Sequence, residues 1–235
     1  MSKRIVITTG GTLGDHLPFI ALGAALKQRG HQVVMALNPA MLVYAERAGL
    51  EVVALPDIAR GPDHARQNAH VWDHWAKLEG RASPPVAPDI SLDEYIEQAR
   101  VLAECSRTAD LLISTSIRVL GLVAHHVSGV PLITASMNPS MFAATGDQAQ
   151  SPEVGQYAAL ITRMVAALGG QAPLIRSASD LHARHILLAS SRHFSVAERA
   201  GFAAETSITQ TGFWFYADPA WAAWQPDPAL RAFAA

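Results

Sequence analysis

The stretch from Arg4 to Pro18 reads RIVITTGGTLGDHLP and joins a β-branched run to a glycine-rich turn. Residues 4–9 are expected to form a buried strand, because isoleucine, valine and threonine bounded by glycines favour that structure. A helix is expected from Leu17 to Arg29, with Pro18 in its first turn and Gly30 past its end. A strand that turns on glycines into a helix is the opening unit of an α/β sheet.

The same alternation continues along the chain. Further strands are expected at 32–37, 51–55, 110–114, 130–135, 186–190 and 207–211, and helices at 39–48, 91–108, 117–128, 153–168, 172–183 and 228–235. Apolar strands that alternate with helices form a parallel sheet covered on both faces. The sequence therefore predicts an α/β protein with a Rossmann-like, doubly wound parallel sheet, whose ligands bind beyond the carboxyl ends of the strands.

Two irregular segments interrupt the alternation, at 57–90 and 136–152. The first contains Trp72 and Trp75 and is expected to include one helix, from about 63 to 78. Loops of this length in a compact domain are usually functional or disordered, and the two tryptophans argue against disorder.

The composition limits the partners of the chain. Half of its 235 residues are hydrophobic and the net charge is −2, whereas nucleic-acid binding requires a concentrated basic surface. Cys105 is the only cysteine, so no intrachain disulfide can form and a reducing cytoplasm is the expected location. No apolar stretch approaches the roughly 18 residues that span a bilayer, although peripheral contact with a membrane is compatible with this composition.

The first glycine-rich loop excludes one phosphate-binding motif and fits another poorly. It lacks the Gly-Lys-Ser/Thr of a P-loop. Gly11 and Gly14 fit the last two glycines of a dinucleotide fingerprint, but Thr9 stands where the first should be, and Asn38 follows the second strand where a ribose-binding acid is expected.

Asp15, at the start of the first helix, has two interpretations from spacing alone. It can cap the helix, or it can serve as a catalytic carboxylate at the mouth of the sheet, where the helix dipole stabilises a negative charge. His16 is either a second base or a residue beside the cap.

The segment from Gly11 to Val33 resembles the opening of bacterial UDP-glycosyltransferase-type enzymes, which have the two-domain GT-B fold. Their pattern G-[ST]-x-G-D-x-x-P-[FL]-x-x-L, followed by a helix and G-H-x-V, is matched at every fixed position. Later segments are similar too, at Gly49–Pro56, Ala109–Ile113, Gly129–Pro131, Ser136–Ser140 and Thr211–Phe213.

The resemblance implies a role for Asp15. In relatives with this Gly-Asp signature, the aspartate is the proposed base that deprotonates the acceptor hydroxyl in an inverting transfer. Other branches place a histidine there and orient it with a later aspartate, whose position falls at about Thr115. That dyad is therefore absent here, and His16 lies about 100° further around the helix.

The resemblance also implies an apolar acceptor, because aromatic and methionine side chains suit such ligands. The residues expected to bind it are Gly14, His16, Trp72, Trp75, Thr115, Met137, Asn138, Met141 and Phe142.

The domain organisation follows from the same family. Residues 1–212 are expected to form the acceptor-binding domain and residues 213–235 an interdomain linker, with the donor-binding domain absent. No tightly bound cofactor is expected, and a UDP- or dTDP-sugar would be held mainly by a donor domain or a separate donor subunit. Such a chain is expected to catalyse little by itself. The alternative is a stand-alone aglycone-binding or accessory protein that partners a transferase.

Other constellations predict no further chemistry. His70 and His74 have helical spacing, as do His182 and His185, but two ligands do not complete a zinc site. The serines after the predicted strands lack the G-x-S-x-G elbow of a hydrolase.

Overall fold

The computed structural model describes residues 1–56, 92–116, 119–138, 152–193, 206–218, 221 and 224–234. These residues form a seven-stranded, wholly parallel sheet in the order β3-β2-β1-β4-β5-β6-β7. The strands are β1 (Arg4–Thr8), β2 (Gln32–Leu37), β3 (Glu51–Ala54), β4 (Leu111–Thr115), β5 (Leu132–Ser136), β6 (His185–Leu188) and β7 (Ser207–Gln210). The predicted doubly wound parallel sheet is therefore confirmed.

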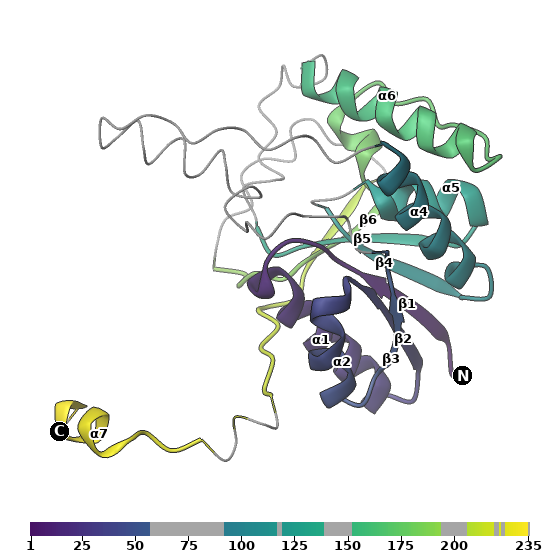
Figure 1. Cartoon of the computed structure of the whole chain (residues 1–235). Coiled ribbons are helices and arrows are strands. Elements are labelled where there is room, and N and C mark those ends of the chain that lie inside the picture. The colour runs from purple at the N-terminus through teal and green to yellow at the C-terminus, as the bar shows by residue number, and fades with distance from the viewer. Residues whose placement is uncertain are drawn as a thin grey trace.

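Helices cover both faces of the sheet (Figure 1). They are α1 (Leu13–Gln28), α2 (Leu42–Arg47), α4 (Leu92–Ser106), α5 (Leu120–Ser128), α6 (Pro152–Ala167) and α7 (Pro228–Ala234), with the short 3-10 helices η1 (Pro39–Met41) and η5 (Ala178–Leu181). Helices α1 and α2 pack on one face, whereas α4, α5 and α6 lie on the other. None of the helices described is long and apolar enough to cross a membrane.

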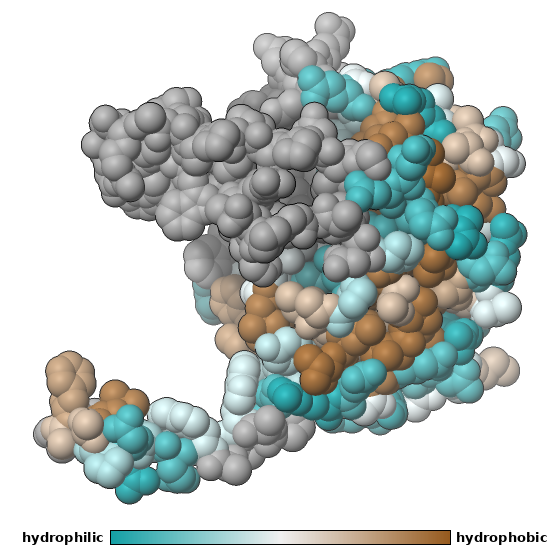
Figure 2. Space-filling model, viewed as in Figure 1, coloured by the Kyte–Doolittle hydropathy of each residue, from teal (hydrophilic) through white to brown (hydrophobic). Residues whose placement is uncertain are grey.

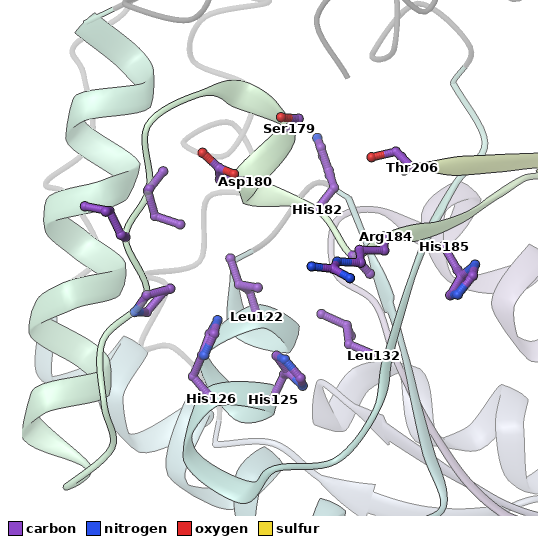
Figure 3. A pocket seen from close by; sticks show the side chains of 14 residues that line it. Leu122, His125, His126, Leu132, Ser179, Asp180, His182, Arg184, His185 and Thr206 are labelled. Carbon is purple, nitrogen blue, oxygen red and sulfur yellow. The ribbon is translucent and has the colours of Figure 1, made fainter. Parts of the chain in front are cut away.

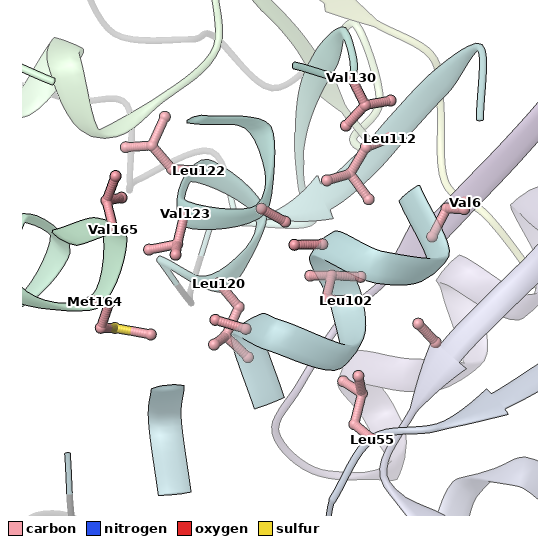
Figure 4. Packing of buried hydrophobic residues seen from close by; sticks show 14 of the residues in the cluster. Val6, Leu55, Leu102, Leu112, Leu120, Leu122, Val123, Val130, Met164 and Val165 are labelled. Atoms are coloured by element: carbon pink, nitrogen blue, oxygen red, sulfur yellow. The ribbon is translucent and has the colours of Figure 1, made fainter. Parts of the chain in front are cut away.

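The two faces have separate cores because successive strand residues point to opposite sides. Ile5 and Ile7 of β1 pack in the cluster beneath α1, while Val6 packs in the cluster beneath α4 and α5. The cluster beneath α4 and α5 also includes Met164 of α6 (Figure 4). A strand buried on both faces must be apolar throughout, which explains the uninterrupted β-branched run at the start of the chain.

The chain reverses direction across the sheet between β1 and β4. It runs outward from β1 through β2 to β3 and then crosses back to β4, which pairs with β1 in register from Ile5↔Leu111 to Thr8↔Ser114. The connections after β1 and β4 lead to opposite faces, so the carboxyl ends of these two strands flank the crevice where ligands of such sheets bind.

Two predicted helices differ from those observed. Helix α1 begins at Leu13 rather than Leu17, so Pro18 lies inside it and not in its first turn. The predicted helix at 172–183 was wrong, since only η5 forms there. Pro173 and a Ser177–Asp180 capping box interrupt this segment, because the box starts a new helical turn rather than continuing an old one. The helix predicted at 63–78 lies outside the described residues.

The segment 213–218 runs in an extended conformation along the α1–α2 side of the domain. Trp214 meets Phe19 of α1 edge-on, with ring centroids 5.7 Å apart. The Tyr216 hydroxyl donates to the Tyr44 carbonyl at 3.1 Å, and the buried Asp218 pairs with Arg47 at 3.3 Å. Alternate side chains of this segment therefore hold it to α1 and α2, and a linker beginning at residue 213 stays a prediction.

The other side chains of the same segment point outward. Phe213 and Phe215 are exposed, Phe215 to 84%. Helix α7 stands apart from the body of the domain in Figures 1 and 2. Figure 2 also shows a hydrophobic area over α1 and α2.

We expect Trp214→Ala to lower the free energy of unfolding by about 2 kcal/mol, because it removes a half-buried ring and its edge contact with Phe19. The matched control is Phe215→Ala, which removes an exposed ring from the adjacent position and is expected to change stability by less than about 0.5 kcal/mol. Urea unfolding of both variants measures the difference. Equal losses would contradict the docking of this segment.

Candidate functional site

The candidate site lies at the carboxyl edge of the sheet, where β1 and β4 end. Polar side chains with little exposure gather along this edge at the end of each central strand: Thr8, Thr9, Ser114, Thr115, Ser136 and Ser190. Since the carboxyl ends of parallel strands share one edge, these hydroxyls form a row beneath the loops that follow. The sequence predicted ligands beyond the carboxyl ends of the strands, but it did not single out Ser190.

Asp15 occupies the third position of α1 and closes a capping box with Thr12. The Thr12 backbone N–H donates to Asp15 Oδ2 at 2.7 Å, and the Thr12 hydroxyl donates to the same oxygen at 2.9 Å. The Asp15 N–H in turn donates to the Thr12 carbonyl at 3.0 Å. The capping interpretation of Asp15 is therefore confirmed.

The capping role leaves one carboxylate oxygen available. Both hydrogen bonds that described residues donate to the Asp15 side chain end on Oδ2, and the residue is only half-buried. Within the described part of the chain no lysine, arginine or histidine forms an ion pair with it. Oδ1 can therefore accept a proton while Oδ2 holds the helix.

Gly11 makes room for this arrangement. Its φ is 120°, a backbone conformation that L side chains rarely adopt, and a Cβ there would lie 2.3 Å from Asp15 Oδ2. Gly14 is different, because a Cβ would approach nothing closer than the Thr12 hydroxyl, at 3.7 Å. Gly11 is thus required by the position of the carboxylate, and Gly14 is not.

His16 points into the protein. Its side chain is fully buried, and Nδ1 lies 2.8 Å from the Thr12 carbonyl. Because a carbonyl only accepts, Nδ1 carries the proton of this bond. The ring therefore braces the same turn that Asp15 caps, and its predicted contact with an acceptor stays a prediction.

The other predicted acceptor residues fall into two groups. Thr115 is buried at the end of β4, Met137 is half-buried against the α1-side core, and Asn138 is exposed with its N–H donating to Ser136 Oγ at 3.1 Å. Strand β4 and the end of β5 bring Thr115, Met137 and Asn138 to the same edge of the sheet as Asp15. Trp72, Trp75, Met141 and Phe142 lie outside the described residues.

A cavity of about 430 Å³ opens at the same edge, beyond the ends of β6 and β7. Arg192, His193 and Gln210 line it, and Gln210 donates to Ser190 Oγ at 3.2 Å. The sequence reasoning did not single out these residues. The signal available was the run Ser190–His193, in which polar and basic residues follow an apolar strand.

The fold and the site together define the class of domain to which the chain belongs. A doubly wound parallel sheet with a half-buried carboxylate at its switch point is a Rossmann-like ligand-binding domain. Residues 5–146 match the glycosyltransferase family 28 N-terminal domain, and the chain belongs to this family.

The solved structures that it resembles are GT-B enzymes, and the chain has the N-terminal half of that fold. A spinosyn forosaminyltransferase superimposes with a TM-score of 0.58 at 16% identity, over 96% of this chain and 54% of that one. A calicheamicin glycosyltransferase gives a TM-score of 0.57 at 16% identity, with the same coverage. At this level of identity the likeness concerns the fold.

The curated relatives are similar over part of their length. An uncharacterised glycosyltransferase of Mycobacterium leprae is 33% identical over 127 residues, which is 52% of this chain and 28% of that protein. The O-mycaminosyltylonolide 6-deoxyallosyltransferase of Streptomyces fradiae is 47% identical over 53 residues, 23% of this chain and 13% of that one. The chain thus spans less than a third of the length of these relatives.

We expect Gly11→Ala to lower the free energy of unfolding by about 1–3 kcal/mol, because alanine is strained at this φ and its Cβ displaces the Asp15 carboxylate. Gly14→Ala is the matched control in the same turn. It is expected to be neutral or to stabilise by up to about 1 kcal/mol, since alanine favours the helix. Urea unfolding measures the free energy of unfolding of both variants. A loss of stability in Gly14→Ala as large as that in Gly11→Ala would show that the turn is not constrained by Asp15.

Proposed function

We propose that this chain is the acceptor-binding half of an inverting glycosyltransferase that moves a sugar from a nucleotide-sugar to a hydroxyl of a hydrophobic small molecule. The observation that carries the proposal is the Asp15 carboxylate, half-buried at the β1–β4 switch point with both of its described hydrogen bonds on Oδ2. Membership of a glycosyltransferase family supplies the reaction class.

Asp15 acts as the general base in this mechanism. Oδ1 takes the proton of the acceptor hydroxyl as the hydroxyl oxygen attacks the anomeric carbon, and the nucleotide diphosphate leaves from the opposite side of the sugar. The Thr12 N–H and hydroxyl keep the carboxylate in one orientation through Oδ2. A base held by its second oxygen loses little freedom on binding the acceptor, which favours the reactive geometry.

The acceptor is proposed to be apolar, with its reacting hydroxyl beside Asp15. Met137 lies at this edge of the sheet. The names of similar proteins support the same class, since they refer to O-mycaminosyltylonolide, spinosyn and calicheamicin. Gly14, Thr115 and Asn138 are proposed to contact this ligand, together with the residues predicted in the two irregular segments.

The donor is proposed to be a UDP- or dTDP-hexose bound mainly by a second domain or subunit. The chain covers 54% of the spinosyn forosaminyltransferase and of the calicheamicin glycosyltransferase, so close to half of each of these two proteins has no matched counterpart. We expect the chain by itself to bind acceptor and to transfer sugar slowly or not at all.

We expect Asp15→Asn to lower kcat of the chain, joined to or complemented by a donor domain, by about 10²–10⁴-fold, because an amide does not accept the proton. Its carbonyl still accepts from Thr12, so the unfolding midpoint should change little. Transfer to a hydrophobic alcohol from a dTDP- or UDP-sugar, followed by mass spectrometry of the product, measures kcat.

The control is Asp180→Asn. Asp180 closes a similar box with Ser177, whose N–H and hydroxyl lie 2.9 Å and 3.1 Å from Asp180 Oδ2, at the opposite edge of the sheet. It should retain full transfer activity. A retained rate in Asp15→Asn, or an equal loss in both variants, would exclude Asp15 as the base.

A second prediction separates the proposed function from a stand-alone binding or accessory role. We expect hydrophobic alcohols to raise the unfolding midpoint of the isolated chain, since a ligand at 100 times its Kd stabilises by about 2.7 kcal/mol. The same alcohols should be glycosylated once a donor domain and nucleotide-sugar are added. Binding without any transfer under those conditions would favour the accessory role.

A further inference from the structure

A second cavity, of about 450 Å³ (Figure 3), lies at the amino edge of the sheet. Asp15 lies at the opposite, carboxyl edge. It is bounded by the C-terminal half of α5, the start of β5, the segment before η5 and the residues that lead into β6 and β7. Its polar lining consists mainly of His125, His126, His182, Arg184 and His185. Four imidazoles and a guanidinium around one cavity are not explained by the transfer reaction.

Among the described residues that line the cavity, Asp180 supplies the one carboxylate, and its hydrogen bonds hold the start of η5 through Oδ2. Asp180 Oδ2 accepts from the backbone N–H groups of Arg176 and Ser177, at 2.8 Å and 2.9 Å, and from the Ser177 hydroxyl. The exposed Arg184 forms no ion pair with any residue in the described ranges. The positive charge of Arg184 is therefore not paired with a carboxylate in the part of the chain that the structure describes.

The histidines of α5 have a defined orientation. His125 Nδ1 lies 2.6 Å from the Val130 carbonyl, which only accepts, so Nδ1 carries a proton and Nε2 is the nitrogen left to bind a ligand. His185 Nδ1 is likewise engaged, at 2.7 Å from Ser207 Oγ. Either atom can donate in the His185–Ser207 bond, whereas the His125 ring gains an Nε2–H donor only when it takes up a second proton.

Repulsion between the two neighbouring imidazoles of α5 opposes protonation of both rings. The rings of His125 and His126 lie 4.8 Å apart, and burial together with the neighbouring His125 lowers the pKa of His126. Burial lowers the pKa of His182 to about 4, so this ring stays neutral near pH 7. An anion between the α5 pair and Arg184 would relieve the repulsion and favour the doubly protonated rings.

We propose that this amino-edge cavity binds a small molecule that carries a phosphate monoester on an apolar body. A phosphate offers three acceptor oxygens, enough to receive Arg184 and both α5 imidazoles together, and such hydrogen bonds between charged groups are the strong ones. Leu122, Leu132 and Ile175 line the cavity beside them and suit the apolar part. The volume is in the range of about 300–1,000 Å³ that is usual for ligand pockets.

A metal ion does not fit the same cluster. In the part of the chain that the structure describes, no three histidine, cysteine, aspartate or glutamate side chains are arranged to hold one. The histidine pair His182 and His185, noted from its spacing, contributes instead to the lining of the cavity. The site is independent of the proposed transfer chemistry, because it lies at the opposite edge of the sheet.

The test measures binding of phenyl phosphate to the chain by isothermal titration calorimetry at pH 7, with phenol as the neutral probe of the same shape. Phenyl phosphate should bind and phenol should not. Arg184→Gln should raise the Kd of phenyl phosphate by about tenfold or more, because one charge-assisted hydrogen bond is lost. The matched control Arg176→Gln removes an exposed guanidinium from outside the cavity and should change the Kd by less than about twofold.

The histidines are tested with sulfate, whose charge does not change between pH 6 and pH 8. Sulfate should bind more tightly at pH 6 than at pH 8, because lowering the pH favours the charged form of His126 beside the cavity. His126→Gln should reduce this pH dependence without lowering the unfolding midpoint at pH 8. Absence of phenyl phosphate binding, equal binding of phenol, equal effects of Arg184→Gln and Arg176→Gln, or a sulfate affinity independent of pH would each overturn the proposal.

Discussion

The hydrogen bonds from Thr12 to Asp15 Oδ2 set the start of α1, and the geometry of the candidate site depends on them. Because one of these bonds satisfies the Thr12 N–H at the N-cap, the helix begins at Leu13, directly after the glycine turn. This early start keeps the carboxylate next to the end of β1. It also places Pro18 within the helix, where a proline cannot donate one of the backbone hydrogen bonds.

Asp15 has a structural role as a cap and a proposed role as a base, and these two roles compete in general but not here. A carboxylate with both oxygens bonded to its own helix would be a poor base, and one with neither would be poorly oriented. Asp15 divides the tasks between its oxygens, with the described bonds confined to Oδ2. Gly11 supports this division, since any larger residue would occupy the space of Oδ2.

The two edges of the sheet differ in chemistry for a topological reason. Parallel strands bring all their carboxyl ends to one side, where hydroxyl side chains and the Asp15 turn gather. The amino ends and the end of α5 meet on the other side, where histidines and Arg184 surround a cavity. Residues from four separate elements contribute to that cavity, so their grouping depends on the whole sheet.

The sequence by itself determined the sheet, because apolar β-branched runs separated by amphipathic segments have few other ways to bury both faces. Five of the seven strands were located to within one residue at both ends, and the motif around Asp15 indicated the family. The predicted helix at 172–183 was wrong because a local capping box, rather than the apolar periodicity of the segment, decides its structure.

The tertiary structure alone decided which oxygen of Asp15 is engaged, that His16 turns into the core and that Trp214 docks on Phe19. It also decided that His125, His126, His182 and Arg184 share one cavity, although about 60 positions separate them along the chain. Local patterns report the conformation of a segment, since backbone hydrogen bonds and periodicity act over a few residues. Which side chains meet depends on the crossing from β3 back to β4, and no local pattern carries that information.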